Sequence, residues 1–234
     1  MSKSLYSQIR SLQNDLNATV GSTENTQPSS KVNRATRDAE VTKQQILDAA
    51  VIEFAKNGLF GARTDAIAKS AGVAPRMIYY YFQSKEGLYQ AVLERPASEF
   101  QQMLEQMNLE ELPAIEALQV FLRTVIAYEI SHRYQGMLLF QEANQNQGKY
   151  FQQTNWSQPL TYVTKILEKG MQEGTFCKQD PYMTTLTIAG ICVFYANAYE
   201  NLKHLTPDVE LLSDEMIERY TQAAINLVLN GVLA

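Results

Sequence analysis

Residues 76–85 bring together side chains that could bind a charged partner. The stretch holds Arg76, three consecutive tyrosines, a phenylalanine and Lys85. A guanidinium can donate two hydrogen bonds to guanine O6 and N7, and a tyrosine can donate its hydroxyl or pack on a thymine methyl. A run of aromatics can also belong to a hydrophobic core or to a ligand site. The direction of each side chain decides between these interpretations.

In a helix these tyrosines cannot share one role. Successive residues are rotated by about 100°, so with Ile78 in the core, Tyr81 and Phe82 lie on the inner side. The residues expected to point outward or to lie on the flanks are Arg76, Met77, Tyr79 and Tyr80. Large aromatics beside an arginine are unusual on an idle surface. The pattern favours DNA contact for this outward set and core packing for the inward set.

The chain before and after these residues divides into short predicted helices. The first is expected over 42–57 and the second opens at a threonine, whereas the third opens at a proline, whose missing N–H is not needed in a first turn. The residues that predict the boundaries are Thr42 and Gly58, Thr64 and Gly72, Pro75 and Phe82, and the cap Ser84. Two short helices joined by a glycine-containing turn predict a helix-turn-helix.

Positive charge is confined to the same part of the chain. Residues 31–95 hold ten Lys and Arg against seven Asp and Glu, whereas residues 96–234 hold eight against sixteen. The formal net charge of −5 therefore hides a basic segment. Such an asymmetry suggests a nucleic-acid surface on one domain.

Other chemistry is not indicated. The two histidines, His132 and His204, lie far apart, and Cys177 and Cys192 have no CxxC partner, so the sequence predicts no catalytic set, metal site or cofactor. The cysteines are expected to be small buried hydrophobes. No signal peptide or membrane-spanning stretch is evident, and we expect a cytoplasmic protein that is not an enzyme.

The rest of the chain also has helical periodicity, which predicts an all-α fold. Further helices are expected over 85–107, 113–132, 134–144, 149–173, 181–204 and 209–231. Pro96 is expected to kink or break its helix, and Pro159 to bend or interrupt another. Residues 1–36 are interpreted as a flexible leader that could form one short helix, 37–84 as the DNA-binding domain, and 85–234 as a second helical domain.

Residues 42–93 closely resemble the DNA-binding domain of TetR/AcrR-family transcriptional regulators. The matching pieces are "ILDAA", "F…G", "T…IA…AGV", "IYYYF" and "SKEGL", in the family's order and spacing. The resemblance implies an N-terminal three-helix DNA reader. It also implies a helical C-terminal domain that binds a small-molecule effector and forms a homodimer, and usually repression that the ligand relieves.

The same resemblance implies roles for single residues. Thr64, Tyr79 and Lys85 match the family's phosphate contacts, and Arg76, Met77 and Tyr80 fall at variable base-reading positions. Two further cations, Lys43 and Arg37, are also predicted to contact phosphates. Three features depart from the family: Ala74 replaces a common Ser or Thr cap, the leader is long, and Pro96 lies in the fourth helix.

Two groups of residues are assigned to the C-terminal domain. Small and apolar residues of its last two helices suit a four-helix dimer interface, with an intramolecular core as the alternative: Ala189, Phe194, Ala196, Tyr220, Ala224, Leu227 and Val228. Polar-tipped aromatics and their neighbours are candidates for a ligand pocket, although each could simply belong to the core: Tyr128, His132, Met137, Phe140, Gln141, Trp156, Tyr162 and Tyr195.

These observations predict a ligand-responsive dimeric repressor of double-stranded DNA. A two-fold dimer would bind a palindromic operator whose half-sites are one helical turn or a multiple apart. The alternative is a ligand-independent helix-turn-helix or architectural protein. An enzyme is not supported, because no nucleophile–base pair is visible.

Overall fold

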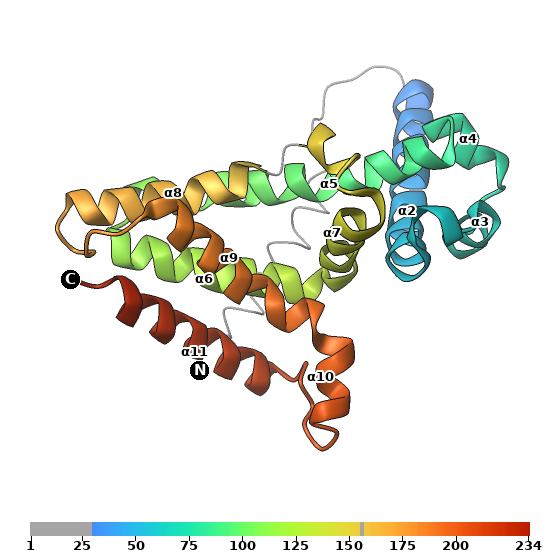
Figure 1. Cartoon of the computed structure of the whole chain (residues 1–234). Helices are drawn as coiled ribbons and strands as arrows, with labels where there is room; N and C mark the ends of the chain where they lie inside the picture. The colour runs from blue at the N-terminus through green and yellow to red at the C-terminus, as the bar shows by residue number, and fades with distance from the viewer. Residues whose placement is uncertain (1–29, 155–156) are drawn as a thin grey trace. The chain divides into compact units, whose positions relative to one another are not determined.

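The computed structural model describes residues 30–154 and 157–234, and this part of the chain is helical (Figure 1). Its one β-type pairing is an isolated bridge between Phe176 and Leu233. The chain divides into two compact units, the first ending at Val92 and the second beginning at Leu93. The predicted all-α fold is confirmed. The predicted leader falls mostly outside the described residues.

Helix α2 (Ser30–Gly61) begins earlier than predicted. Thr42 does not cap a helix end: its Oγ1 donates to the carbonyl of Asp38 at 2.8 Å, one turn back in the same helix. The predicted start at Thr42 is therefore wrong. The predicted end is close, because Gly58 has a left-handed φ of 68° and interrupts the helical geometry.

Helices α3 (Thr64–Ala71) and α4 (Arg76–Phe82) form the predicted helix-turn-helix. Gly72 closes α3 in the left-handed conformation, which glycine adopts without steric cost. Thr64 is the first helical residue and not the cap; Arg63 holds the cap position without a side-chain hydrogen bond. The core of this unit is built from large apolar residues of four helices: Ile46, Phe54, Leu59, Ile67, Ile78, Leu88 and Tyr89.

Helix α5 (Lys85–Gln106) starts as predicted, because the Ser84 hydroxyl accepts a hydrogen bond from the amide of Gly87 at 2.9 Å. Pro96 lies inside this helix, which continues to Gln106. The prediction of a break at Pro96 is thus wrong.

The second unit is organised around α6 (Ala114–Ser131), which packs against α7 (Arg133–Asn146), α8 (Ser157–Gln172), α9 (Pro181–Asn197) and α11 (Asp214–Val232). In Figure 1 these helices lie on different sides of α6. Every residue over 124–130 is buried. A helix surrounded in this way carries no exposed polar face along that stretch.

The remaining elements are short. They are the 3-10 turns η1 (Leu109–Glu111) and η2 (Phe151–Gln153) and the helix α10 (Tyr199–Leu205). Three predicted boundaries in this unit are wrong. The helix expected over 149–173 begins at Ser157, so that Pro159 lies harmlessly in its first turn. The helix expected over 181–204 is divided at Ala198, and the last helix begins at Asp214 behind the cap Ser213.

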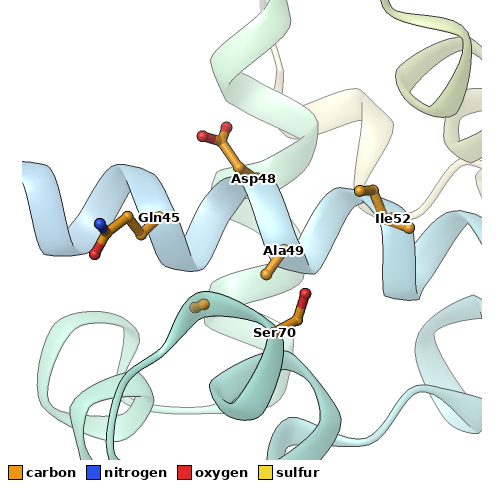
Figure 2. A pocket seen from close by; sticks show the side chains of 6 residues that line it. Gln45, Asp48, Ala49, Ile52 and Ser70 are labelled. Atoms are coloured by element: carbon orange, nitrogen blue, oxygen red, sulfur yellow. The ribbon is translucent and has the colours of Figure 1, made fainter.

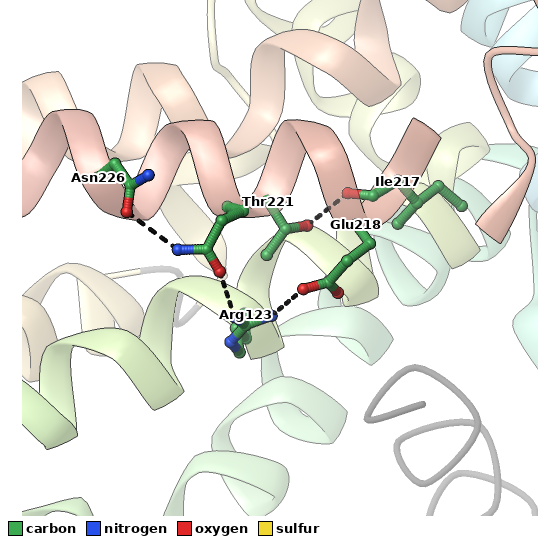
Figure 3. A network of polar contacts seen from close by, with 6 residues as sticks. Arg123, Ile217, Glu218, Thr221 and Asn226 are labelled. Atoms are coloured by element: carbon green, nitrogen blue, oxygen red, sulfur yellow. Dashed lines mark hydrogen bonds and ion pairs between the residues drawn. The ribbon is translucent and has the colours of Figure 1, made fainter. Parts of the chain in front are cut away.

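A polar network joins α6 to α11 on the surface of this unit (Figure 3). The guanidinium of Arg123 donates to Glu218 Oε1 at 2.9 Å and to Gln222 Oε1 at 2.8 Å. The Gln222 amide in turn donates to Asn226 Oδ1 at 2.9 Å. Because the partners of the half-buried Arg123 are exposed to solvent, the network is expected to add little stability.

Candidate nucleic-acid interface

The side chains of α4 separate into an inner and an outer set, as the helical rotation predicts. Ile78 has no exposed surface, and Phe82 is 7% exposed. Tyr80 is 75% exposed and Tyr79 50% exposed, and Arg76 is exposed beside them. The outer face of α4 therefore presents hydrogen-bond donors and aromatic surface to the solvent.

The three predicted base-reading residues line one shallow hollow on α4. Arg76, Met77 and Tyr80 surround an open volume of about 340 Å³. The Tyr80 ring stands edge-on to Tyr81, with the centroids 5.0 Å apart, and Tyr81 is half-buried. This contact restricts the Tyr80 ring while its outer face stays open.

Two of the predicted phosphate-binding residues contact each other. The hydroxyls of Thr64 and Tyr79 lie 3.2 Å apart and share a hydrogen bond, which joins the first turn of α3 to α4. The N-terminus of α3 also offers free backbone N–H groups and the positive end of the helix dipole. Hydroxyls and amides together form a suitable environment for an anion.

Lys85 lies in the same unit but is already engaged. Its ammonium donates to the carbonyl of Ala62 at 3.0 Å and to that of Phe60 at 3.3 Å, in the segment that leads into α3. The carboxylate of Glu53 accepts a hydrogen bond from the Arg63 amide at 3.1 Å in the same segment. An ammonium has three donors, so one remains for a phosphate.

The other predicted phosphate contacts lie on α2. Arg37 is exposed and Lys43 is half-buried, and no contact links either of them to Thr64 or Tyr79 in the described part of the chain. Sequence reasoning did not single out Arg63, whose exposed side chain stands at the cap of α3. A basic residue directly before the threonine that begins the helix is the signal that could have found it.

A second hollow of about 350 Å³ lies where α2 faces α3 (Figure 2). It is lined by Gln45, Asp48, Ala49, Ile52, Ser70 and Ala71. None of the predicted DNA contacts is among these residues. The hollow is therefore separate from the outer face of α4.

In the second unit, two predicted pocket residues are stacked in the core. The rings of Tyr128 and His132 are 4.2 Å apart and nearly parallel. The Tyr128 hydroxyl donates to Gln135 Oε1 at 3.1 Å, and burial raises the pKa of Tyr128 well above its usual value. Tyr195 forms a separate stack with Tyr220 at 4.4 Å.

The other predicted pocket residues are scattered. Tyr195 donates its hydroxyl to the carbonyl of Leu211 at 2.7 Å, and Phe140 is 52% exposed. Three more are half-buried, namely Met137, Gln141 and Tyr162. Trp156 lies outside the described residues. The structure thus brings Tyr128 and His132 together but does not gather the whole group.

Sequence reasoning missed Glu129, the neighbour of Tyr128. Its side chain is 9% exposed, and burial raises its pKa to about 7. A single glutamate in the otherwise apolar run "VIAYEI" is the signal that could have found it.

The residues predicted for the dimer interface separate by exposure. Phe194 and Leu227 are 59% and 65% exposed, and Ala189 and Tyr220 are half-buried. The others lie in the core of their own unit: Ala196, Ala224 and Val228. Exposed apolar side chains that the prediction left out are Tyr182, Met183 and Leu186 on α9.

Within residues 30–154 and 157–234, no group of three or more His, Cys, Asp or Glu is placed to hold a metal ion. No helix in that part of the chain is long and apolar enough to cross a membrane.

Comparison with known proteins connects these features. Residues 46–92 match the family of bacterial regulatory proteins of the tetR family, and residues 115–228 match a tetracyclin repressor-like C-terminal domain. The HTH-type transcriptional repressor NicS of Pseudomonas putida is 32% identical over 166 residues, which are 68% of this chain and 77% of that protein. The transcriptional regulator RutR of Escherichia coli is 43% identical over 60 residues, 26% of this chain and 28% of that protein.

The fold agrees with solved structures. The transcriptional regulator FadR of Bacillus subtilis, solved in complex with stearoyl-CoA, superposes with a TM-score of 0.66 at 23% identity, covering 80% of this chain and 98% of that chain. The helix-turn-helix geometry, the two matching family models and the repressor NicS agree with one another. The chain therefore belongs to the TetR family of bacterial regulatory proteins and is a DNA-binding transcriptional regulator.

Proposed function

We propose that the protein is a homodimeric repressor that binds a palindromic operator and releases it when a small molecule binds the second unit. One observation carries the DNA-binding part of this proposal. Tyr80 and Tyr79 are 75% and 50% exposed beside Arg76, on a short helix whose opposite side is fully buried. A rigid helix that presents a guanidinium and phenols outward suits insertion into the major groove.

Base contacts and phosphate contacts come from different residues in this proposal. The base-reading residues are Arg76, Met77 and Tyr80, which share one hollow. The phosphate-binding residues are Thr64, Tyr79, Lys85, Lys43 and Arg37. The base contacts provide sequence specificity, whereas the phosphate contacts fix the register of the protein on the duplex.

Dimerisation would use the exposed apolar surface of α9 and α11. Phe194 and Leu227 are large, apolar and more than half exposed, and Tyr182 and Met183 extend the surface along α9. Exposed apolar patches of this kind mark interaction sites. A second copy would cover the patch by two-fold symmetry, so that two α4 helices meet two half-sites.

The effector would act by a population shift. Ligand binding would favour a conformation of the dimer whose two α4 helices no longer match the half-site spacing. FadR of Bacillus subtilis, with the same fold, was solved in complex with stearoyl-CoA, which supports a ligand response in this protein. We place the site among the core helices of the second unit, where Tyr128 and His132 stack.

Selection of bound fragments from random DNA tests the proposal. We expect enrichment of one palindrome, and we expect fluorescence anisotropy to give two protomers per site. Enrichment of a single unrepeated half-site would contradict the dimer. Absence of any enriched sequence would contradict base reading and favour a ligand-independent architectural protein.

A further inference from the structure

Glu129 is a buried carboxyl group without a partner. It lies on α6 with 9% of its side chain exposed. Among the described residues, none donates a hydrogen bond to this carboxyl group or forms an ion pair with it. Burial of an unpaired charge is costly, so proteins keep such groups chiefly where they serve a function.

The nearby donors are committed to other acceptors. The Tyr128 hydroxyl donates to Gln135, and the Asn197 amide donates to the carbonyl of Val193 at 2.9 Å. The other amide atom, Asn197 Oδ1, is buried and has no hydrogen-bond partner. Asn197 Oδ1 is therefore a buried acceptor without a partner, in the same unit as the Glu129 carboxyl group.

Both acceptors meet at Gly136 of α7. A Cβ atom added at Gly136 would lie 2.7 Å from Asn197 Oδ1 and 3.0 Å from Glu129 Oε2. The two oxygens thus approach one point from α6 and α9, and the missing side chain at residue 136 lets them do so. Buried polar atoms without partners call for a donor that is not part of the chain.

A second buried carboxylate shows the contrast. Glu142 on α7 has no exposed surface, but its Oε2 accepts from Asn146 Nδ2 at 2.6 Å and its Oε1 accepts from the Tyr150 amide at 2.7 Å. The fold thus satisfies both oxygens of one buried carboxylate and leaves the other open. The missing partner of Glu129 is therefore not explained by a general lack of space or of hydrogen-bond donors in this unit.

The chemistry of the pair limits its occupant. The Asn197 oxygen and the ionised form of Glu129 only accept hydrogen bonds, so together they favour a ligand with N–H or O–H donors, and the carboxylate favours one with positive charge. A hard metal ion would need about six oxygen ligands, and the described residues contain no such group. An organic cation suits this pair of oxygens, because its N–H groups can donate to more than one acceptor.

We propose that Glu129 and Asn197 form the polar anchor of the effector site, and that the effector carries a protonated amine. This inference rests on the proposed ligand response and names the chemical class of the ligand. The ammonium would donate to Glu129 Oε2 and Asn197 Oδ1. Tyr128, whose ring stacks on that of His132, directly precedes Glu129 in α6.

Burial keeps two neighbouring titratable groups neutral near pH 7 and leaves Glu129 able to ionise there. Burial raises the pKa of Glu129 to about 7, and it raises the pKa of Cys192 on α9 to about 12. The pKa of Tyr128 is also raised, by burial first and then by the charges of Glu99 and Glu129, so both Tyr128 and Cys192 stay neutral near pH 7.

Charged groups of the neighbouring helices form ion pairs, although Arg133 Nη1 is buried and makes no hydrogen bond. From α5, Arg95 and Glu99 act on Tyr128 and form an ion pair at 3.6 Å. From α7, Arg133 pairs with Glu200 at 3.5 Å. A bound cation would therefore stabilise the ionised form of Glu129, and its affinity should increase as pH rises through about 7.

The test uses the full chain and three amines: methylammonium, benzylamine and putrescine. Methanol and benzyl alcohol serve as neutral isosteres. We expect at least one amine to raise the melting temperature and to bind in calorimetry, with its neutral isostere inactive. The Glu129→Gln variant keeps the shape but not the charge, and should bind that amine roughly 10- to 100-fold more weakly.

Two further variants make the test specific. Asn197→Ala should also weaken amine binding, whereas Glu142→Gln removes a buried carboxylate of the same unit and should leave amine affinity unchanged. Equal affinity in the wild type and in Glu129→Gln would overturn the proposal. So would binding of none of the three amines.

Failure of this inference is distinguishable from failure of the proposed function. DNA binding is measured separately, by anisotropy with the selected operator fragment. If the operator is bound but no amine binds, the repressor proposal stands and the cationic effector is rejected. If amines bind but leave operator affinity unchanged, the anchor stands and the ligand-release mechanism is rejected.

Discussion

The ammonium of Lys85, the first residue of α5, donates a hydrogen bond to the carbonyl oxygen of Ala62 at 3.0 Å. Together with the bond to Phe60, it ties the start of α5 to the segment that precedes α3. Because α3 and α4 pack on each other, this bond also fixes the base of the outward-facing helix. Lys85 is thus a positioning residue as well as a predicted phosphate contact.

Lys85→Met should lower both stability and DNA affinity. Loss of two partly exposed charge-assisted bonds is expected to reduce the free energy of unfolding by about 1 kcal/mol. Loss of one phosphate contact should reduce the slope of log K against log salt by about 0.9. Urea unfolding and anisotropy at several salt concentrations measure the two effects, with the exposed Lys69→Met as control. An unchanged slope would mean that Lys85 only positions the loop.

Arg76→Ala should weaken binding at one base position. We expect a loss of about 1–3 kcal/mol on the selected operator and a smaller loss on random DNA. Competition with operators changed one base pair at a time would locate the contact. Lys165→Ala, at an exposed lysine on α8 outside both proposed surfaces, is the control and should leave affinity unchanged. The same loss on operator and random DNA would refute a base contact.

Glu129→Gln should change how stability depends on pH. The pKa of Glu129 is raised from 4.5 to about 7, so the native state holds this proton more tightly than the unfolded chain does. Its contribution is full below pH 4.5 and is lost as pH rises through about 7, a decrease of about 3 kcal/mol. Urea unfolding at pH 5 and pH 8 measures this effect. The free energy of unfolding of the variant, relative to that of the wild type, should be higher at pH 8 than at pH 5. A stability difference that is independent of pH would contradict the raised pKa.

Leu227→Glu should separate the protomers without unfolding them. The side chain is 65% exposed in one protomer, so a charge there costs little until a second copy covers it. We expect sedimentation to show monomers, helicity to be unchanged, and operator affinity to fall by more than about tenfold. Leu205→Glu, at a 75% exposed leucine on α10, is the control and should remain dimeric. If the Leu227→Glu variant stayed dimeric and bound the operator with unchanged affinity, α11 would not be part of the dimer interface.

Local pattern was sufficient to predict the orientation of α4. Its seven residues contain one apolar row, and Ile78 and Phe82 are buried as the rotation requires. The start of α2 was mispredicted because the residues before Thr42 are polar and carry no apolar periodicity, so a capping threonine looked like the first signal.

Other features depend on contacts between distant parts of the chain. The bond from Lys85 to Ala62 spans 23 positions and has no local signature. Glu129 was overlooked because periodicity identifies amphipathic helices, whereas α6 is buried on all sides at this point. The predicted dimer residues Ala196 and Val228 were assigned by size, which does not distinguish a helix contact within the chain from one between chains.

The burial of residues 124–130 on every side of α6 has a consequence for how such a sensor can change. Any substitution in this stretch repacks several neighbouring helices at once, so a new ligand preference acquired here would come with a loss of stability. Gly136 on α7 shares this constraint, because a Cβ atom there would lie 2.7 Å from Asn197 Oδ1 and 3.0 Å from Glu129 Oε2. Substitutions that alter ligand preference should therefore occur first on the helices that surround α6, and last within residues 124–130 of α6 itself.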